Sequence, residues 1–135
     1  MRKIVSIAAV VIFGTVLAGA AHASLKAPAM SAAAEDGQLL LTVSGSTNTW
    51  IRGVRLNCPP ASNATHPHAP EACSALAEAQ GDFDALSGDP KSCSPKYDPV
   101  TASATGTYRG RRVAWHGTFG NACALDAATG PVFRF

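Results

Sequence analysis

VTASATGTYRGRRVAWHGTF, residues 100–119, is the segment from which the architecture of this chain follows. Apolar and polar side chains alternate along 100–108 and again along 111–119, which is the period of a strand with one buried face. Between the two runs, Gly110 can adopt the positive φ that a tight turn requires. The segment therefore predicts an antiparallel β-hairpin whose turn is Arg109-Gly110.

Further strands are predicted on both sides of this hairpin. An apolar run at 38–43 indicates a buried strand, and alternation at 50–57 indicates a second one. The aromatic pattern at 131–135 predicts a last strand, and residues 120–123 are expected to form a turn. Together these segments predict a sheet of five antiparallel strands.

A helix is predicted from Pro70 to Gly81, because proline is favoured in a first turn and glycine after a last one. Cys73 and Leu76 fall on one face of that helix, so both should point toward the core. A further helical turn is predicted at 82–86. We therefore expect an α+β domain with one or two helices on one side of the sheet.

The N-terminus has the three parts of a secretory signal peptide. Arg2 and Lys3 supply positive charge, an apolar run extends from Ile4 to Ala18, and Ala21-His22-Ala23 forms a small-x-small cleavage site. The apolar run is shorter than the roughly 20 residues that a membrane-spanning helix needs. We therefore expect a secreted protein that has no membrane anchor after cleavage.

Cleavage divides the chain into three parts. Residues 1–23 are the signal peptide, residues 24–36 are a flexible arm rich in Ala, Ser and Pro, and residues 37–135 form one domain. The full chain has a net charge of +2, and removing Arg2 and Lys3 leaves nine basic against nine acidic side chains. A neutral domain lacks the basic surface that nucleic-acid binding requires.

Four cysteines lie in the secreted part of the chain. An even number of cysteines outside the cell favours two disulfides, which three different pairings could satisfy. Zinc binding is the alternative, but no Cys-x-x-Cys spacing is present. We therefore expect two disulfides and no metal or other cofactor. The cysteines are Cys58, Cys73, Cys93 and Cys123.

Histidines are the remaining candidates for chemistry. His66 and His68 flank a proline without a nearby carboxylate, so we interpret them as loop residues rather than metal ligands. His116 is the best candidate for a catalytic base, but strand alternation places it opposite Val113 and Trp115, on the solvent side. No nucleophile elbow or phosphate-binding loop accompanies it. The sequence therefore predicts no catalytic residue and a binding protein rather than an enzyme.

The main candidate for function is a loop between the helix and the hairpin. It contains CSPKYDP, in which a disulfide cysteine precedes two prolines and a basic side chain that we expect to be exposed. A loop that is stiff before binding loses little conformational entropy when it binds. Such a loop could offer its backbone to a protease without being digested. Its residues are Cys93, Ser94, Pro95, Lys96, Tyr97, Asp98 and Pro99.

Several short motifs, taken in order, resemble the Streptomyces subtilisin inhibitor family. The resemblance covers almost the whole secreted chain, from Leu39 to Phe135, and includes the cysteine spacing. Each motif is weak alone, and their common order makes the resemblance specific. They are Thr65-His66-Pro67, Ala72-Cys73 with Leu76-Ala77, Gly81-Asp82 with Ala85-Leu86, Tyr97-Asp98-Pro99-Val100, residues 106–113 and Phe119-Gly120-Asn121-Ala122-Cys123.

The resemblance implies a five-stranded antiparallel sheet with two helices packed on one side, in a protein that is usually a homodimer. It also implies disulfides that join Cys58 to Cys73 and Cys93 to Cys123. Members of the family are substrate-like inhibitors of extracellular serine proteases, chiefly subtilisin-like and in some cases trypsin-like. The implied partner of this chain is therefore an extracellular serine protease.

In that family the second residue after the third cysteine is P1, the residue that enters the specificity pocket of the protease. Transferred to this chain, P1 is Pro95, P1′ is Lys96, and the reactive bond is Pro95–Lys96. Asn121 matches an asparagine whose side chain supports the loop from behind.

Two departures from the family pattern leave three outcomes open. Proline at P1 lacks the N–H that substrates donate, and the segment from Cys73 to Cys93 is one residue shorter than is usual. A shift by one residue would make Lys96 P1 and Lys96–Tyr97 the reactive bond, which suits a trypsin-like pocket. The chain is then an inhibitor with Lys96 as P1, a weak inhibitor with Pro95 as P1, or a disulfide-stapled binding module that has lost inhibition.

Overall fold

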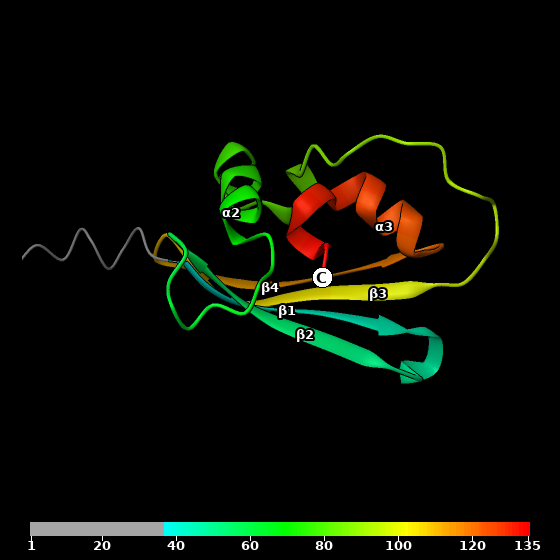
Figure 1. The fold of residues 1–135 in the computed structure, drawn as a ribbon, viewed down its shortest axis with the longest axis horizontal. Helices are drawn as coiled ribbons and strands as arrows, with labels where there is room; N and C mark the ends of the chain where they lie inside the picture. Colours follow the sequence, from blue (N-terminus) through cyan, green and yellow to red (C-terminus); the bar gives the residue numbers. More distant parts are fainter. Residues whose placement is uncertain (1–36) are drawn as a thin grey trace, which may run out of the picture.

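The computed structural model describes residues 37–135, so the predicted signal peptide and arm lie outside the described part of the chain. The described residues form a four-stranded antiparallel sheet with the order β2-β1-β3-β4 (Figure 1). A short 3-10 helix, η1 (Ser46–Asn48), connects the first two strands. The strands are β1 (Gly37–Gly45), β2 (Ile51–Cys58), β3 (Val100–Tyr108) and β4 (Arg111–Phe119).

The predicted hairpin is confirmed by the pairing of β3 with β4. Tyr108 pairs with Arg111, which leaves Arg109 and Gly110 as the turn. Both turn residues have positive φ, 48° and 76°, as a two-residue turn that matches the twist of its strands requires. Glycine adopts this conformation without a steric penalty.

Two helices, α2 (Ala69–Glu78) and α3 (Ala122–Thr129), lie on one face of the sheet (Figure 1). The 3-10 helices η2 (Phe83–Ala85) and η3 (Gly130–Phe133) complete this layer. Buried residues alternate with more exposed ones along β1, and the helix predicted from the Pro70 and Gly81 signals is present as α2. The core lies between the two layers, and its largest fully buried side chains are Leu41, Leu56, Leu76 and Val132.

The prediction of a fifth strand at 131–135 is wrong. Pro131 lies in the first turn of η3, and the consecutive side chains of Val132 and Phe133 are both buried. Consecutive side chains of a strand point to opposite faces, so a strand could not direct both into this core. The turn expected at 120–123 is correct only in part: the chain bends at residues 120 and 121, but Ala122 and Cys123 already belong to α3, for which Asn121 is the N-cap.

His66 is buried and joins the segment before α2 to η3. Its Nδ1 accepts a hydrogen bond from the backbone N–H of His68 at 3.0 Å, so its Nε2 carries the proton and donates to the carbonyl of Val132 at 2.9 Å. Burial lowers the pKa of His66 from its ordinary value of 6.5. These contacts give His66 a structural role as a neutral side chain.

Two further observations concern the described residues as a whole. Nowhere in residues 37–135 do three or more His, Cys, Asp or Glu side chains gather closely enough to hold a metal ion. In the same range, no helix has both the length and the apolar character needed to cross a membrane.

Candidate functional site

An irregular segment joins η2 to β3 and bows outward along one edge of the molecule (Figure 1). Every residue from Ser94 to Asp98 is exposed, and Tyr97 is 78% exposed. On either side the chain returns to the domain, because Cys93 and Pro99 are partly buried. We call Ser94–Asp98 the exposed arch.

A disulfide anchors the start of the exposed arch. Cys93 is bonded to Cys123 in the first turn of α3, and the two Cα atoms are 5.7 Å apart. The second disulfide joins Cys58 at the end of β2 to Cys73 in α2. This pairing is the one that the family resemblance implies.

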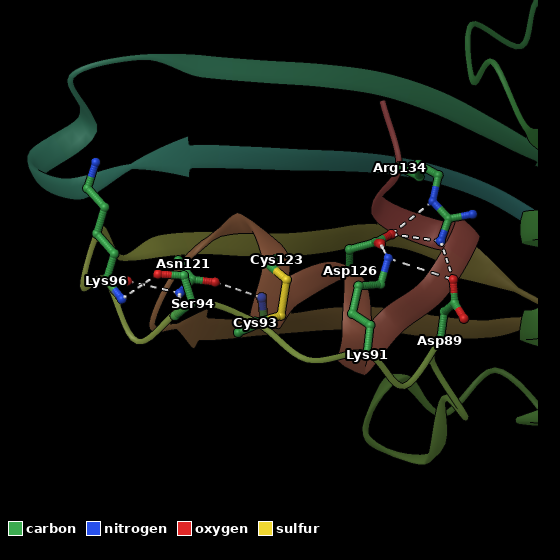
Figure 2. The surroundings of a disulfide bond; sticks show 10 residues. Asp89, Lys91, Cys93, Ser94, Lys96, Asn121, Cys123, Asp126 and Arg134 are labelled. Atoms are coloured by element: carbon green, nitrogen blue, oxygen red, sulfur yellow. Dashed lines mark hydrogen bonds and ion pairs between the residues drawn. A yellow bond between two sulfur atoms is a disulfide. The ribbon is translucent and has the colours of Figure 1, made fainter.

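Asn121 supports the exposed arch from the side that faces α3 (Figure 2). Its Nδ2 donates hydrogen bonds to the carbonyl oxygens of Ser94 at 3.1 Å and of Lys96 at 2.9 Å. Its Oδ1 accepts a hydrogen bond from the backbone N–H of Ala124 at 2.8 Å, which caps α3. One side chain therefore fixes both the start of a helix and the backbone on either side of Pro95.

Two further hydrogen bonds hold the backbone of the exposed arch. The hydroxyl of Ser94 accepts the backbone N–H of Lys96 at 3.3 Å. At the end of the arch, the N–H of Asp98 donates to the carbonyl of Gly120 at 2.9 Å. The arch is thus tied down before, within and after the Pro95–Lys96 bond, while the Lys96 side chain remains exposed.

An ion cluster lies where the loop approaches α3 (Figure 2). Asp126 of α3 accepts hydrogen bonds from Lys91 and from Nε of Arg134, the latter at 2.8 Å. Asp89 lies 3.2 Å from Nη2 of Arg134 and 3.7 Å from Nζ of Lys91. Burial alone would raise the pKa of Asp126, but the hydrogen bonds from Arg134 and Lys91 outweigh it and lower that pKa from 3.8.

Close backbone packing accompanies this cluster. The N–H of Asp89 donates to the carbonyl of Ala127 at 3.0 Å. Gly88 has a φ of +66°, and a Cβ at this position would lie 2.1 Å from the same carbonyl oxygen. A glycine is therefore required for the loop to lie directly on α3.

Comparison with known proteins relates this chain to a family. A family model described as subtilisin inhibitor-like matches residues 35–121. The chain is 42% identical over 121 residues to subtilisin inhibitor-like protein 4 of Streptomyces lavendulae, which covers 86% of this chain and 97% of that protein. The chain belongs to the subtilisin inhibitor-like family.

Other proteins agree with membership of the subtilisin inhibitor-like family. A probable subtilase-type protease inhibitor of Streptomyces avermitilis is 41% identical over 123 residues, which cover 88% of this chain and 85% of that protein. A solved structure of Streptomyces caespitosus sermetstatin in complex with Bacillus licheniformis subtilisin matches with a TM-score of 0.58 and 35% identity, covering 74% of this chain and 99% of that chain. The resemblance inferred from the motifs is therefore confirmed.

The structure brings some candidate residues of this subtilisin inhibitor-like chain together and separates others. Asn121, Cys123 and the exposed arch form one cluster at the start of α3. His116 instead lies on β4, exposed and paired with Ser103 of β3, while its neighbour Trp115 packs against the core. His116 is thus not part of the loop cluster.

Sequence reasoning missed the ion cluster and the capping role of Asn121. Lys91 lies two residues before Cys93, and Asp126 lies three residues after Cys123, so the disulfide pairing was a usable signal for that ion pair. Asn121 directly before an alanine-rich segment was a usable signal for an N-cap. Arg134 offered no local signal, because its contact with Asp89 spans 45 residues.

Proposed function

We propose that this chain inhibits an extracellular subtilisin-type serine protease by binding its active site like a substrate, through the exposed arch. The observation that carries this proposal is the pair of hydrogen bonds from Asn121 to the carbonyls of Ser94 and Lys96. A loop that is held in shape before binding loses little conformational entropy in the complex. A relative with a similar fold has been crystallised in complex with subtilisin, which supports a protease as the partner.

We assign Pro95–Lys96 as the reactive bond. In an extended chain successive carbonyls point to opposite sides, so the carbonyl of Pro95 should point away from Asn121 and toward an approaching enzyme. The carbonyl of P1 must reach the oxyanion hole of the protease. The alternative bond, Lys96–Tyr97, requires the Lys96 carbonyl for that purpose, and Asn121 already holds this carbonyl at 2.9 Å.

The same contacts would oppose net hydrolysis of the reactive bond. After cleavage, the Cys93–Cys123 disulfide and the hydrogen bond from Asn121 to Ser94 would retain one new end. The contact of Asn121 with Lys96 would retain the other. The new amine of Lys96 would also stay beside the Ser94 hydroxyl, so resealing of the bond competes with release.

Titration of the purified protein against subtilisin and trypsin tests the function and the register together. We expect inhibition of subtilisin, and we expect Lys96→Ala to leave that inhibition nearly unchanged. Trypsin inhibition that disappears in Lys96→Ala would instead identify Lys96 as P1. No inhibition of either enzyme, even with methionine at position 95, would favour the alternative, a binding module of the same fold that has lost inhibition.

We also propose that the protein is a homodimer formed through the face of the sheet that carries no helix. Leu40 on that face is 47% exposed and lies between Arg55 of β2 and Thr105 of β3. Burial of Leu40 against a second copy would remove its apolar surface from water, which favours association. Sedimentation should give a dimer for the native protein and a monomer for Leu40→Lys, whereas a native monomer would contradict the assembly.

Secretion completes the proposal. We expect removal of residues 1–23, so that the protein recovered from culture medium begins at Ser24. Mass spectrometry should detect only this shortened chain and none that retains residues 1–23. We assign no catalytic role to His116, which lies exposed on the sheet. Its substitution should leave protease inhibition unchanged.

A further inference from the structure

The residue that we assign to P1 is a proline, and this narrows the class of protease that the loop can fit. The inference rests on the proposed function, with Pro95–Lys96 as the reactive bond. Substrates bind serine proteases as an added extended strand, in which the P1 N–H donates to a backbone carbonyl of the enzyme. Pro95 has no N–H to donate, so that carbonyl would be buried without a partner.

The loss of this hydrogen bond is large enough to distinguish proteases that need a P1 N–H from proteases that do not. A buried acceptor left without its donor weakens binding by about 5- to 150-fold. The pyrrolidine ring is also short, and it fixes φ near −65°, so it fills a pocket made for a long or aromatic side chain poorly. Neither loss applies to an enzyme whose specificity pocket is shaped for proline and whose P1 contacts require no N–H.

The contacts around Pro95 oppose a shift to another register. Asn121 holds the carbonyls on both sides of Pro95, at 3.1 and 2.9 Å. The hydroxyl of Ser94 holds the N–H of Lys96 at 3.3 Å, which closes a second short bridge across the proline. The residue before a proline is itself restricted to extended conformations, so Pro95 also stiffens Ser94. The proline is therefore displayed at the centre of the arch and held there.

We propose that the cognate target is a serine endopeptidase that cleaves protein chains after proline. The exposed arch belongs to a folded domain and bows outward from one of its edges (Figure 1). The target therefore needs an open cleft that admits a folded protein, which excludes peptidases that act only on short peptides. Lys96 and Tyr97, both exposed, are the side chains that would meet the primed side of that cleft.

The test compares inhibition constants for two enzymes: a proline-specific serine endopeptidase that digests intact proteins, and subtilisin. The inhibitors are the native protein, Pro95→Leu and, as a matched control, Pro90→Leu, which makes the same change at an exposed proline outside the exposed arch. We expect the native protein to inhibit the proline-specific enzyme about 100-fold more tightly than Pro95→Leu does. Pro95→Leu should in turn inhibit subtilisin about 10- to 100-fold more tightly than the native protein. Pro90→Leu should reproduce the native preference.

Each contrary result has a separate meaning. Equal inhibition of subtilisin by the native protein and Pro95→Leu would overturn the inference, and so would equal inhibition of the proline-specific enzyme. If Pro95→Leu inhibits subtilisin tightly but the native protein inhibits no proline-specific enzyme, the target class is wrong and the inhibitory loop stands. If neither protein inhibits subtilisin or the proline-specific enzyme, although both melt at the same temperature, the proposed function itself fails.

Discussion

Lys91 and Asp126 form an ion pair that runs beside the Cys93–Cys123 disulfide (Figure 2). Asp126 is 25% exposed at its side chain and also accepts a hydrogen bond from Arg134. The segment that leads into the exposed arch is therefore joined to α3 by a covalent bond and by charge, in addition to the backbone hydrogen bond from Asp89 to Ala127.

Replacing Lys91 with methionine should lower the free energy of unfolding by about 0.2–1 kcal/mol, because a partly exposed ion pair is lost. Asp126→Asn should cost more, since it removes the carboxylate that accepts hydrogen bonds from both Lys91 and Arg134 and leaves the two cations to share Asp89. Urea denaturation at low and high salt measures both effects. Lys96→Met is the matched control in the same loop and should be neutral. A Lys91→Met effect that does not shrink at high salt would contradict an electrostatic origin.

The ion cluster should also make stability depend on acid pH. The hydrogen bonds from Arg134 and Lys91 lower the pKa of folded Asp126 from 3.8 despite burial, so the unfolded chain binds the proton more readily. The contribution is then present above about pH 3.8 and is lost as the pH falls through the lowered pKa. Denaturation curves from about pH 5 to about pH 2 should show this loss in the native protein. The free energies of unfolding of the native protein and of Asp126→Asn should converge in acid. A constant difference between them would contradict a role of ionised Asp126 in stability.

Asn121 should have separable effects on stability and on inhibition. Asn121→Asp keeps an oxygen that can cap α3 but removes both donors to the exposed arch, so it should weaken inhibition while the melting temperature changes little. Losing two hydrogen bonds corresponds to about 1–3 kcal/mol, or about 5- to 150-fold in the inhibition constant. Asn121→Ala should show the same weakening and, in addition, lose about 1 kcal/mol of stability with the cap. Unaltered inhibition by Asn121→Asp would exclude a supporting role.

The two disulfides should differ in their effect on the loop. Replacing Cys93 and Cys123 by serine removes a cross-link over 30 residues, and replacing Cys58 and Cys73 removes one over 15 residues. Each double variant should lose about 3–4 kcal/mol of stability in the chain-entropy model. Only the first should turn the protein from an inhibitor into a substrate that subtilisin cleaves within the exposed arch. Mass spectrometry after incubation with subtilisin distinguishes the two, and equal cleavage of both would contradict a local function for Cys93–Cys123.

His66 should make the free energy of unfolding decrease as the pH is lowered from neutral. Burial lowers its pKa in the folded state from 6.5, so protonation favours the unfolded chain. The stabilisation is complete above about pH 6.5 and declines as the pH falls below it, toward the lowered pKa. Melting temperatures from about pH 8 to about pH 5 should show this decline in the native protein and in His116→Gln, and a weaker one in His66→Gln. The same slope in all three would exclude His66 as its source.

Local patterns were sufficient for the β3–β4 hairpin and for α2. Each of these predictions depends on residues only a few positions apart in the sequence. They are the alternation along a strand, the Arg109-Gly110 turn and the proline in the first turn of a helix. The failure at 131–135 is of another kind. Val132 and Phe133 have side chains typical of a strand, but both are buried in the layer of helices. Their conformation is set by packing against the core, and the intrinsic strand propensity of the two residues does not predict it.

Family membership and the position of the candidate loop could thus be inferred from the order of the residues alone, because motifs and cysteine spacings are properties of the linear chain. The resemblance also implied that Asn121 supports the loop, but the two carbonyls that it holds on either side of Pro95 could not be inferred from the sequence. Asn121 reaches Ser94 and Lys96 across 27 and 25 residues, and Arg134 reaches Asp89 across 45. These groups become neighbours because α3 and η3 pack beside the loop, and distances of that kind are set by how elements pack rather than by the residues adjacent to each group.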